Sequence, residues 1–167
     1  MYRKYNNYAT FGAGYLSSSR RSDISKTIGI DFQFHIRREQ FQIGMNMSGP
    51  EFLSNNNLQG HFGYGWRKEK NKSNIAVFGG LSYYTGVLAI EDTALGIIPY
   101  YYEGFGLYAS AQFITKFTYD IGMGIEGFGE LSPGQSSIGI KFILFFSGAY
   151  RGPKKNYNVN VRSENKR

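Results

Sequence analysis

The sequence predicts an all-β protein: an eight-stranded antiparallel up-and-down transmembrane β-barrel with a polar C-terminal tail. The 167 residues are rich in Gly, Tyr and Phe, and no long run of helix-forming residues interrupts them. Apolar residues alternate with other residues at a period of two in one segment after another. The clearest segment, 24–36, is longer than a typical soluble strand and long enough for a tilted strand to cross a bilayer.

The first half of the chain is expected to form four strands, over 8–16, 24–36, 41–48 and 58–67. A polar loop over 17–23, a tight reversal at 37–40 and a loop rich in Gly, Pro and Asn over 48–57 separate them. The apolar sets are Ala9, Phe11, Ala13 and Tyr15; Ile28, Ile30, Phe32, Phe34 and Ile36; Phe41, Ile43, Met45 and Met47; and Leu58, Phe62, Tyr64 and Trp66.

The second half is expected to form strands over 74–84, 102–114, 117–126 and 137–147. The facing of 74–84 is ambiguous, because Ala76, Phe78 and Tyr84 make its second face nearly as apolar as its first. Residues 85–100 are expected to be the longest irregular connection, and 130–136 to be a loop. The other apolar sets are Phe105, Leu107, Ala109, Ala111 and Phe113; Phe117, Tyr119, Ile121, Met123 and Ile125; and Ile138, Ile140, Phe142, Leu144 and Phe146.

Alternation alone leaves two interpretations of the apolar face, which could meet lipid or could line the dry core of a soluble, lipocalin-like calyx. Aromatic residues near strand ends favour lipid. The polar faces are rich in Gly, Ser, Thr, Asn and Gln, whereas soluble surfaces are rich in Lys and Glu. Glycines fall on the polar face, where they would leave room in the narrow interior of an eight-stranded barrel.

Charged residues on the polar faces are expected to pair inside the barrel, because an isolated buried charge is very costly. The alternative is a lipid-modifying enzyme of the lipid A acylase or deacylase type that uses an interior His. We expect no catalytic residues, no cofactor and no metal, since two His residues without a consistent carboxylate spacing are a weak metal signal. The expected interior network is Asp31, His35, Arg37, His61, Arg67, Asp120, Glu126 and Lys141.

Basic residues gather at the end of the barrel that holds the termini and the short turns. The net charge is +7, and much of it lies in residues 151–167, which we expect to be a basic, flexible tail after a barrel domain over 1–150. This end could be a charged rim or a docking surface for an acidic partner. Nucleic acid is not an expected partner, because no nucleic-acid module accompanies the charge. The docking residues would be Arg38, Lys68, Lys70, Lys72, Arg151, Lys154, Lys155 and Arg162.

The sequence excludes cysteine-based sites and a transmembrane helix. There is no cysteine, so disulfides and thiolate metal sites are absent, and no run of eighteen apolar residues could form a transmembrane helix. No apolar segment follows the basic residues near Met1, so no secretory signal is visible and we expect a processed or recombinant form.

The strand pattern over 8–150 resembles the small outer-membrane barrels typified by the OmpA transmembrane domain and OmpX, and the Tyr, Asn and Lys usage is similar to that of barrels from Bacteroidota. The strand 138–146 is similar to the C-terminal assembly signal of such proteins, but seventeen residues follow Tyr150 where that family would stop. The resemblance implies the outer membrane of a Gram-negative bacterium, with lipid and lipopolysaccharide around the barrel. We expect a non-enzymatic scaffold or accessory subunit that binds envelope proteins or peptidoglycan.

Overall fold

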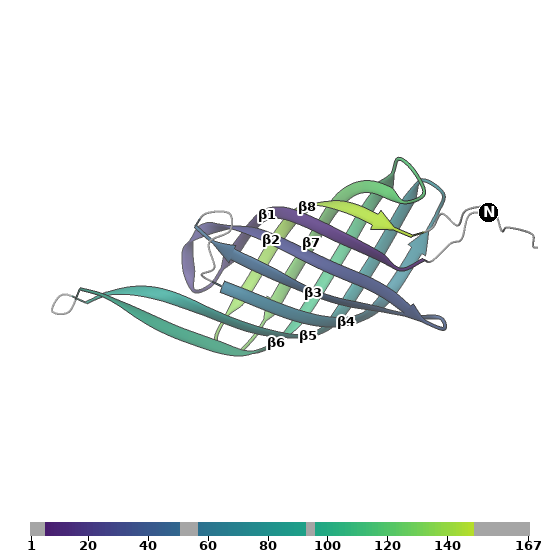
Figure 1. The fold of residues 1–167 in the computed structure, drawn as a ribbon. Coiled ribbons are helices and arrows are strands. Elements are labelled where there is room, and N and C mark those ends of the chain that lie inside the picture. The colour runs from purple at the N-terminus through teal and green to yellow at the C-terminus, as the bar shows by residue number, and fades with distance from the viewer. Residues whose placement is uncertain (1–5, 51–56, 93–95, 149–167) are drawn as a thin grey trace, which may run out of the picture.

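The computed structural model describes residues 6–50, 57–92 and 96–148, and it confirms a closed barrel with its strands in sequence order (Figure 1). Each strand pairs antiparallel with its sequence neighbours, and β1 pairs with β8 to close the sheet. Closure gives every strand a partner on both sides along the middle of the wall. The strands are β1 (Tyr8–Ser18), β2 (Arg21–Ile36), β3 (Glu39–Gly49), β4 (Asn57–Glu69), β5 (Ser73–Asp92), β6 (Gly96–Lys116), β7 (Ile121–Leu131) and β8 (Ser136–Ser147).

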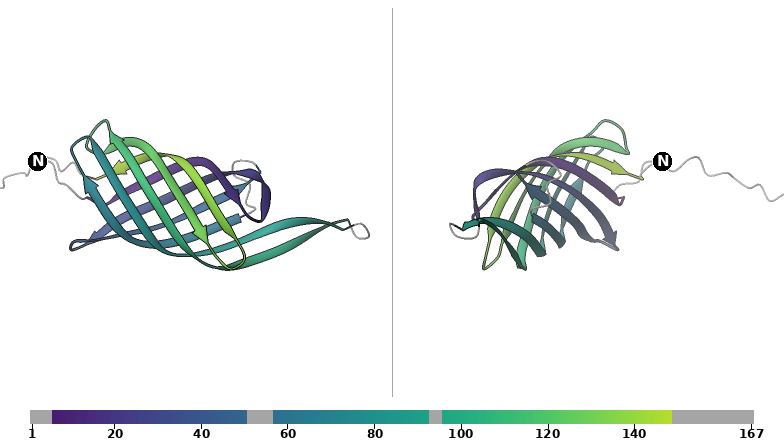
Figure 2. Two further views of the ribbon diagram at one scale, coloured as in Figure 1. Left: turned by 180° about the vertical axis from the view of Figure 1, so that it is seen from behind. Right: turned by 60° about the vertical axis from the view of Figure 1, so that its left-hand side comes forward.

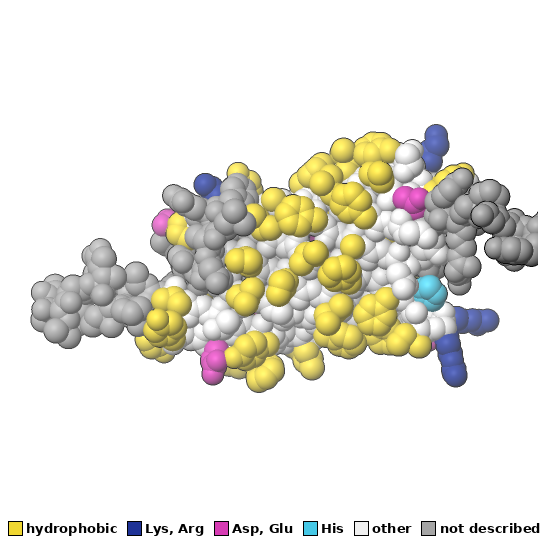
Figure 3. Space-filling view, viewed as in Figure 1, with side chains coloured by type: hydrophobic (Ala, Val, Ile, Leu, Met, Phe, Trp, Pro, Cys, Tyr) yellow, Lys and Arg dark blue, Asp and Glu magenta, His cyan; other side chains and the backbone are white. Residues whose placement is uncertain are grey.

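The outer surface of the barrel is apolar and its interior is largely polar. Phe105 and Ile138 on the outside are 74% and 71% exposed, whereas Lys141 on the inside is fully buried. Apolar side chains cover the visible wall from one end to the other (Figure 3). A soluble calyx would have the opposite arrangement, with apolar side chains lining its cavity, so that interpretation is wrong. The large exposed apolar surface is instead typical of a wall that faces lipid.

The ambiguous fifth strand is resolved by its packing. Ile75, Val77 and Leu81 point outward and are exposed, while Ala76 and Phe78 are buried in the interior. The interior is therefore not polar throughout, as the alternation pattern had predicted, but also contains buried apolar side chains. The buried apolar side chains form two clusters, Tyr8, Ile114, Ile143 and Phe145 in one and Leu16, Tyr108 and Phe128 in the other.

Residues 85–92 and 96–100 do not form an irregular connection but extend β5 and β6 into a long hairpin; residues 93–95 lie outside the described residues. The pairing of β4 with β5 ends at Gly86, and the pairing of β6 with β7 ends at Leu107. Beyond these points β5 and β6 pair only with each other, up to Asp92 and Gly96. The hairpin projects past the rest of the barrel, as Figure 1 and the left view of Figure 2 show. Backbone pairing thus continues where the alternation of side chains stops.

The turn between β6 and β7 is longer than expected, and β7 begins at Ile121 instead of residue 117. The backbone N–H of Phe117 donates to Ile121 O at 3.0 Å, which closes a turn. The Thr118 hydroxyl oxygen accepts from the backbone N–H groups of Asp120 and Ile121. This side-chain capping explains why the alternation of Phe117 and Tyr119 does not continue the strand.

The two ends of the barrel differ in their connections. The turn end holds residues 37–38, 70–72 and 117–120, together with the start of β1 and the end of β8, where Tyr8 pairs with Ser147. The loop end holds the other connections and the projecting hairpin. Two expected loops there are shorter than predicted, because strands leave only residues 19–20 and 132–135 outside. The described residues include no helix long and apolar enough to span a membrane.

Candidate functional site

A network of charged side chains crosses the middle of the barrel. His61 Nε2 of β4 lies 2.7 Å from Asp31 Oδ1 of β2. The ammonium of Lys141 on β8 lies 3.2 Å from Asp31 Oδ2 and 3.4 Å from Glu126 Oε2 of β7. One lysine thus bridges two carboxylates, and the second carboxylate oxygen of Asp31 is held by the histidine. All four side chains are enclosed.

Neutral side chains complete this arrangement. Lys141 Nζ donates to Asn46 Oδ1 at 2.8 Å, and Asn46 Nδ2 donates to Gln59 Oε1 at 3.0 Å. The Tyr108 ring stacks on His61 with 3.9 Å between ring centroids, and its hydroxyl donates to Glu126 Oε1 at 3.3 Å. We call Asp31, Asn46, His61, Tyr108, Glu126 and Lys141 the central network.

Two glycines make room for the central network. Gly44 of β3 lies between Asp31 and His61 in the register, opposite both of them. A Cβ at Gly44 would lie 2.2 Å from Asp31 Oδ1 and 2.8 Å from His61 Nε2. A Cβ at Gly29 would lie 2.9 Å from Lys141 Nζ. The absence of side chains at these positions lets charges on separate strands meet directly.

A second charged group fills the interior at the turn end. Arg67 NH2 donates to Glu69 Oε2 at 2.9 Å, and Lys116 Nζ bonds to the other oxygen of Glu69. The Arg67 Nε–H also donates to Asn74 Oδ1 at 2.9 Å, and its guanidinium lies over the Tyr8 ring. We call Arg67, Glu69, Asn74 and Lys116 the turn-end cluster.

The structure places the expected interior residues in three different environments. Asp31, His61, Glu126 and Lys141 lie in the central network, and Arg67 lies in the turn-end cluster. The other three, His35, Arg37 and Asp120, lie outside both groups, contrary to expectation.

His35 lies half-buried at the rim, where its Nδ1 is 2.9 Å from Asn7 Oδ1. Arg37 is exposed in the turn after β2, because the strand ends at Ile36 before its side chain can enter the interior. Asp120 lies half-buried in the turn that precedes β7, because the Thr118 hydroxyl caps that turn and β7 begins only at Ile121.

Three interior charges were missed by sequence reasoning. Glu69, Lys116 and Glu130 were assigned to turns and a loop, yet all three are buried inside strands. The Ser82 hydroxyl donates to Glu130 Oε1 at 2.6 Å. The alternation could have found them, because side chains an even number of residues apart on a strand point to the same face. Glu69, Lys116 and Glu130 are each an even number of residues from a buried inward residue of the same strand: Arg67, Gln112 and Glu126.

The expected docking residues divide between described and undescribed parts of the chain. Arg38, Lys68, Lys70 and Lys72 are exposed at the turn end. Arg151, Lys154, Lys155 and Arg162 lie outside the described residues. Glu39 is also exposed at this end, and the exposed acids Asp23 and Glu103 lie towards the loop end.

A cleft of about 840 Å³ opens in the wall beside these cations. The ladder between β3 and β4 ends at Gln40 and Gly65, whereas the ladder between β4 and β5 continues to Glu69. Residues 66–69 of β4 therefore have a partner strand on one side only, which leaves a step in the wall. We call this opening the turn-end cleft; it is lined by residues 35 and 37–40, 64–67 and 77–79.

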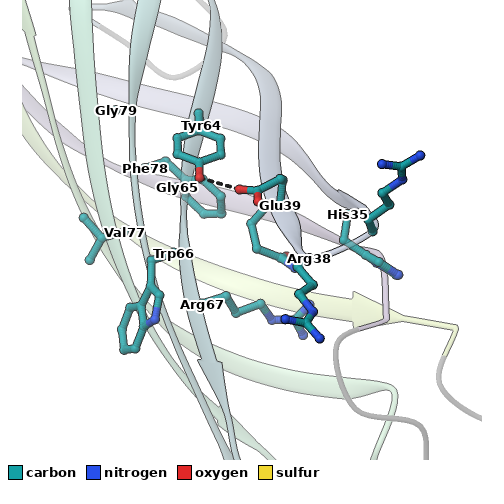
Figure 4. A pocket seen from close by; sticks show the side chains of 12 residues that line it. His35, Arg38, Glu39, Tyr64, Gly65, Trp66, Arg67, Val77, Phe78 and Gly79 are labelled. Atoms are coloured by element: carbon teal, nitrogen blue, oxygen red, sulfur yellow. Dashed lines mark hydrogen bonds between the residues drawn. The ribbon is translucent and has the colours of Figure 1, made fainter.

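The lining of the turn-end cleft is charged on one side and apolar on the other. Figure 4 shows His35 and Arg38 on one side, and Trp66 and Val77 on the other. The Tyr64 hydroxyl donates to the Glu39 carboxylate across the cleft (Figure 4). Trp66 is 57% exposed, so an apolar group outside the wall could contact its ring.

Groups of three or more His, Cys, Asp or Glu side chains that could hold a metal ion are not found in the part of the chain that the structure describes. In the central network, Asp31 and Glu126 share the lysine ammonium, which occupies the position a cation would take.

Comparisons with known proteins find similarity in structure but not in sequence. No protein-family model matches the sequence, and no curated protein matches it. The crystal structure of Neisserial surface protein A (NspA) is similar with a TM-score of 0.66 and 10% identity, over 84% of this chain and 96% of that chain.

Two further structures agree. The N-terminal β-barrel domain of Pseudomonas aeruginosa OprF has a TM-score of 0.58 and 10% identity, over 84% of this chain and 98% of that domain. Ail, the attachment invasion locus protein of Yersinia pestis, has a TM-score of 0.58 and 4% identity, over 87% and 99%. None of them bears on the Bacteroidota assignment, which stays a prediction from composition. At these identities the likeness is one of fold: the chain has the architecture of the small eight-stranded outer-membrane barrels.

Proposed function

We propose that this protein is an integral barrel of a Gram-negative outer membrane that has no catalytic activity and serves as a scaffold or accessory subunit of an envelope complex. Its turn end would face the periplasm, as short turns do in known barrels. The observation that carries the proposal is the gathering of exposed cations at that end, whereas the interior cations Arg67, Lys116 and Lys141 are paired with buried carboxylates.

The membrane location is supported by the apolar wall and by the shared fold. Outward side chains such as Phe11, Phe62 and Phe142 are about half exposed and form a surface that lipid and lipopolysaccharide would cover. Such a surface would be an aggregation hazard in water.

A passive interior supports a role that depends on the ends of the barrel. The central network and the apolar clusters fill an interior that is only wide enough for side chains in an eight-stranded barrel. Solute passage would require breaking buried ion pairs, which is costly.

The two histidines offer little support for a lipid-modifying enzyme. His61 is 5% exposed, bonded to Asp31 and stacked on Tyr108, so a substrate at the lipid edge would not reach it. His35 is bonded to Asn7. Among the described residues neither imidazole is hydrogen-bonded to a Ser, Thr or Tyr hydroxyl that it could activate as a nucleophile.

The proposed docking role concerns charge at one end. Lys70 and Lys72 lie in the turn between β4 and β5, where they are exposed and could contact an anionic envelope protein or peptidoglycan. The tail adds Arg151, Lys154, Lys155 and Arg162 in sequence.

The test is cross-linking in native membranes followed by purification of the tagged barrel. The variants are Lys70→Gln with Lys72→Gln, and a deletion of residues 152–167. The matched control, Asp23→Asn with Glu103→Gln, changes two exposed charges towards the opposite end. All variants should insert and keep heat-modifiable gel mobility. Recovery of cross-linked envelope proteins or peptidoglycan should fall for the turn-end variants and not for the control, and unchanged recovery would remove the docking role.

A further inference from the structure

We propose that the turn-end cleft binds an anionic glycerophospholipid of the periplasmic leaflet, with its phosphate at Arg37 and Arg38 and its acyl chain along Tyr64, Trp66 and Val77. This inference rests on the proposed membrane location, and it assigns a ligand to a part of the turn end that is separate from Lys70 and Lys72.

The cleft joins two surfaces of different chemistry. Trp66 and Val77 are 57% and 49% exposed on the apolar wall, next to the end of the strand ladder. Arg37 and Arg38 lie in the turn that follows β2 and are exposed beyond that wall. An amphiphile with an anionic head and an apolar chain matches this order along the barrel axis, whereas a soluble acidic partner would leave the apolar side uncovered.

Arginine suits the phosphate in particular. Its planar guanidinium can donate two parallel hydrogen bonds to phosphate oxygens. The only carboxylate that lines the cleft, Glu39, already accepts a hydrogen bond from Tyr64. His35 at the same rim adds another nitrogen that could donate to the head group.

The turn itself has a backbone feature that points to a use for its side chains. Arg37 has a φ of 59°, and it is the only non-glycine residue with positive φ in the described part of the chain. Asn or Gly would adopt this conformation at lower cost in a two-residue hairpin turn. Arg37 therefore holds the backbone in a conformation that costs more for arginine than for Asn or Gly, which indicates that its side chain has a use beyond forming the turn.

The leaflet follows from the end of the barrel. Short turns of outer-membrane barrels face the periplasm, and the periplasmic leaflet consists of glycerophospholipids. Lipopolysaccharide would meet the opposite end, where the exposed residues Asp23 and Glu103 are acidic.

Trp66 allows a direct test, because it is the only tryptophan in the chain. The protein is inserted into phosphatidylcholine vesicles, and insertion is checked first by heat-modifiable gel mobility. Trp66 fluorescence is then quenched with dibrominated phosphatidylglycerol or, at the same mole fraction, with dibrominated phosphatidylcholine. We expect the anionic lipid to bind beside Trp66 about five-fold more strongly.

The test variant is Arg37→Asn with Arg38→Gln, in which Asn keeps the positive φ accessible. Its matched control is Lys70→Gln with Lys72→Gln, which removes the same charge from the same end but outside the cleft. The preference should disappear in the first variant and persist in the second. Equal quenching by both lipids in the parent protein, or equal loss in both variants, would overturn the proposal.

A further variant and two outcomes for the parent protein keep this proposal testable and distinct from the proposed function. If the double variant fails to insert, Arg38→Gln alone is measured, and it should lower the preference by at least half. If the parent protein itself fails to insert, the proposed membrane location is wrong as well. If it inserts but shows no lipid preference, only the phospholipid site is lost.

Discussion

The central network and the turn-end cluster are both buried and ionic, yet their anions and cations are balanced differently. In the central network Lys141 is the sole Lys or Arg and faces two carboxylates, Asp31 and Glu126. In the turn-end cluster Glu69 is the sole carboxylate and faces two cations, Arg67 and Lys116. Removing one lysine therefore leaves two buried carboxylates without a lysine partner in one case, with only His61 and Tyr108 of the described residues bonded to them, and an intact Arg67–Glu69 ion pair in the other.

Their surroundings also differ. Lys141 and Glu126 have no exposed surface, and the Lys141 ammonium packs over the Phe128 ring. Arg67 lines the turn-end cleft and is 5% exposed. Water can reach a charge at the cleft more easily than one in the middle of the barrel. The difference teaches that the number of ion pairs in a barrel says little about its stability. What matters is whether each charge, when it loses one partner, still has a second partner or access to water.

The largest expected effect comes from Lys141→Met. Asp31 and Glu126 would lose their shared cation without access to water, so the free energy of unfolding should fall by about 3 to 5 kcal/mol. The measurement is urea unfolding of the barrel in lipid vesicles, followed by gel mobility. A triple variant that also carries Asp31→Asn and Glu126→Gln should regain most of the loss. Parent-like stability of the single variant would contradict the assigned role of Lys141.

An intermediate effect is expected from Gly44→Ala. The new methyl group would lie 2.2 Å from Asp31 Oδ1 and 2.7 Å from the carbonyl oxygen of Ile30, so the central network must shift. We expect a loss of about 1 to 3 kcal/mol, as for other overpacked sites. Gly127→Ala is the control, because a Cβ there meets nothing within 4 Å. Equal stability of the two variants, measured by the same unfolding assay, would show that Gly44 is not needed for the network.

The smallest effect is expected from Lys116→Met. Glu69 keeps its bond to Arg67, and the end of the Lys116 side chain already lies over the apolar Phe145 ring, so an apolar side chain is tolerated there. The loss should be within about 1 kcal/mol, since no buried charge becomes unpaired. Unfolding midpoints of this variant and Lys141→Met, compared side by side, measure the contrast between the two groups. A loss of stability as large as that of Lys141→Met would contradict the expected contrast between the two groups.

Most of the wall could be predicted from local pattern. Alternation over 24–36 and 137–147 assigned outward residues such as Phe32 and Phe142 correctly, because the period of two is a property of each strand alone. The ends of strands were harder. β5 and β6 continue past residue 84 and before residue 102 because their backbones pair with each other, which needs no alternation. β7 starts late because Thr118 caps a turn.

The sequence by itself determined the number and order of the strands, the apolar face that meets the outside, and the placing of Asp31, His61 and Lys141 on the other face. Only the tertiary structure decided which of these charges meet. Asp31 and Lys141 are 110 residues apart, and their contact depends on barrel closure and on the stagger between strands. The same stagger ends the β3–β4 ladder before β4 itself ends, and so creates the turn-end cleft. Side-chain direction is a local property, whereas register across a closed sheet is set by all eight strands together.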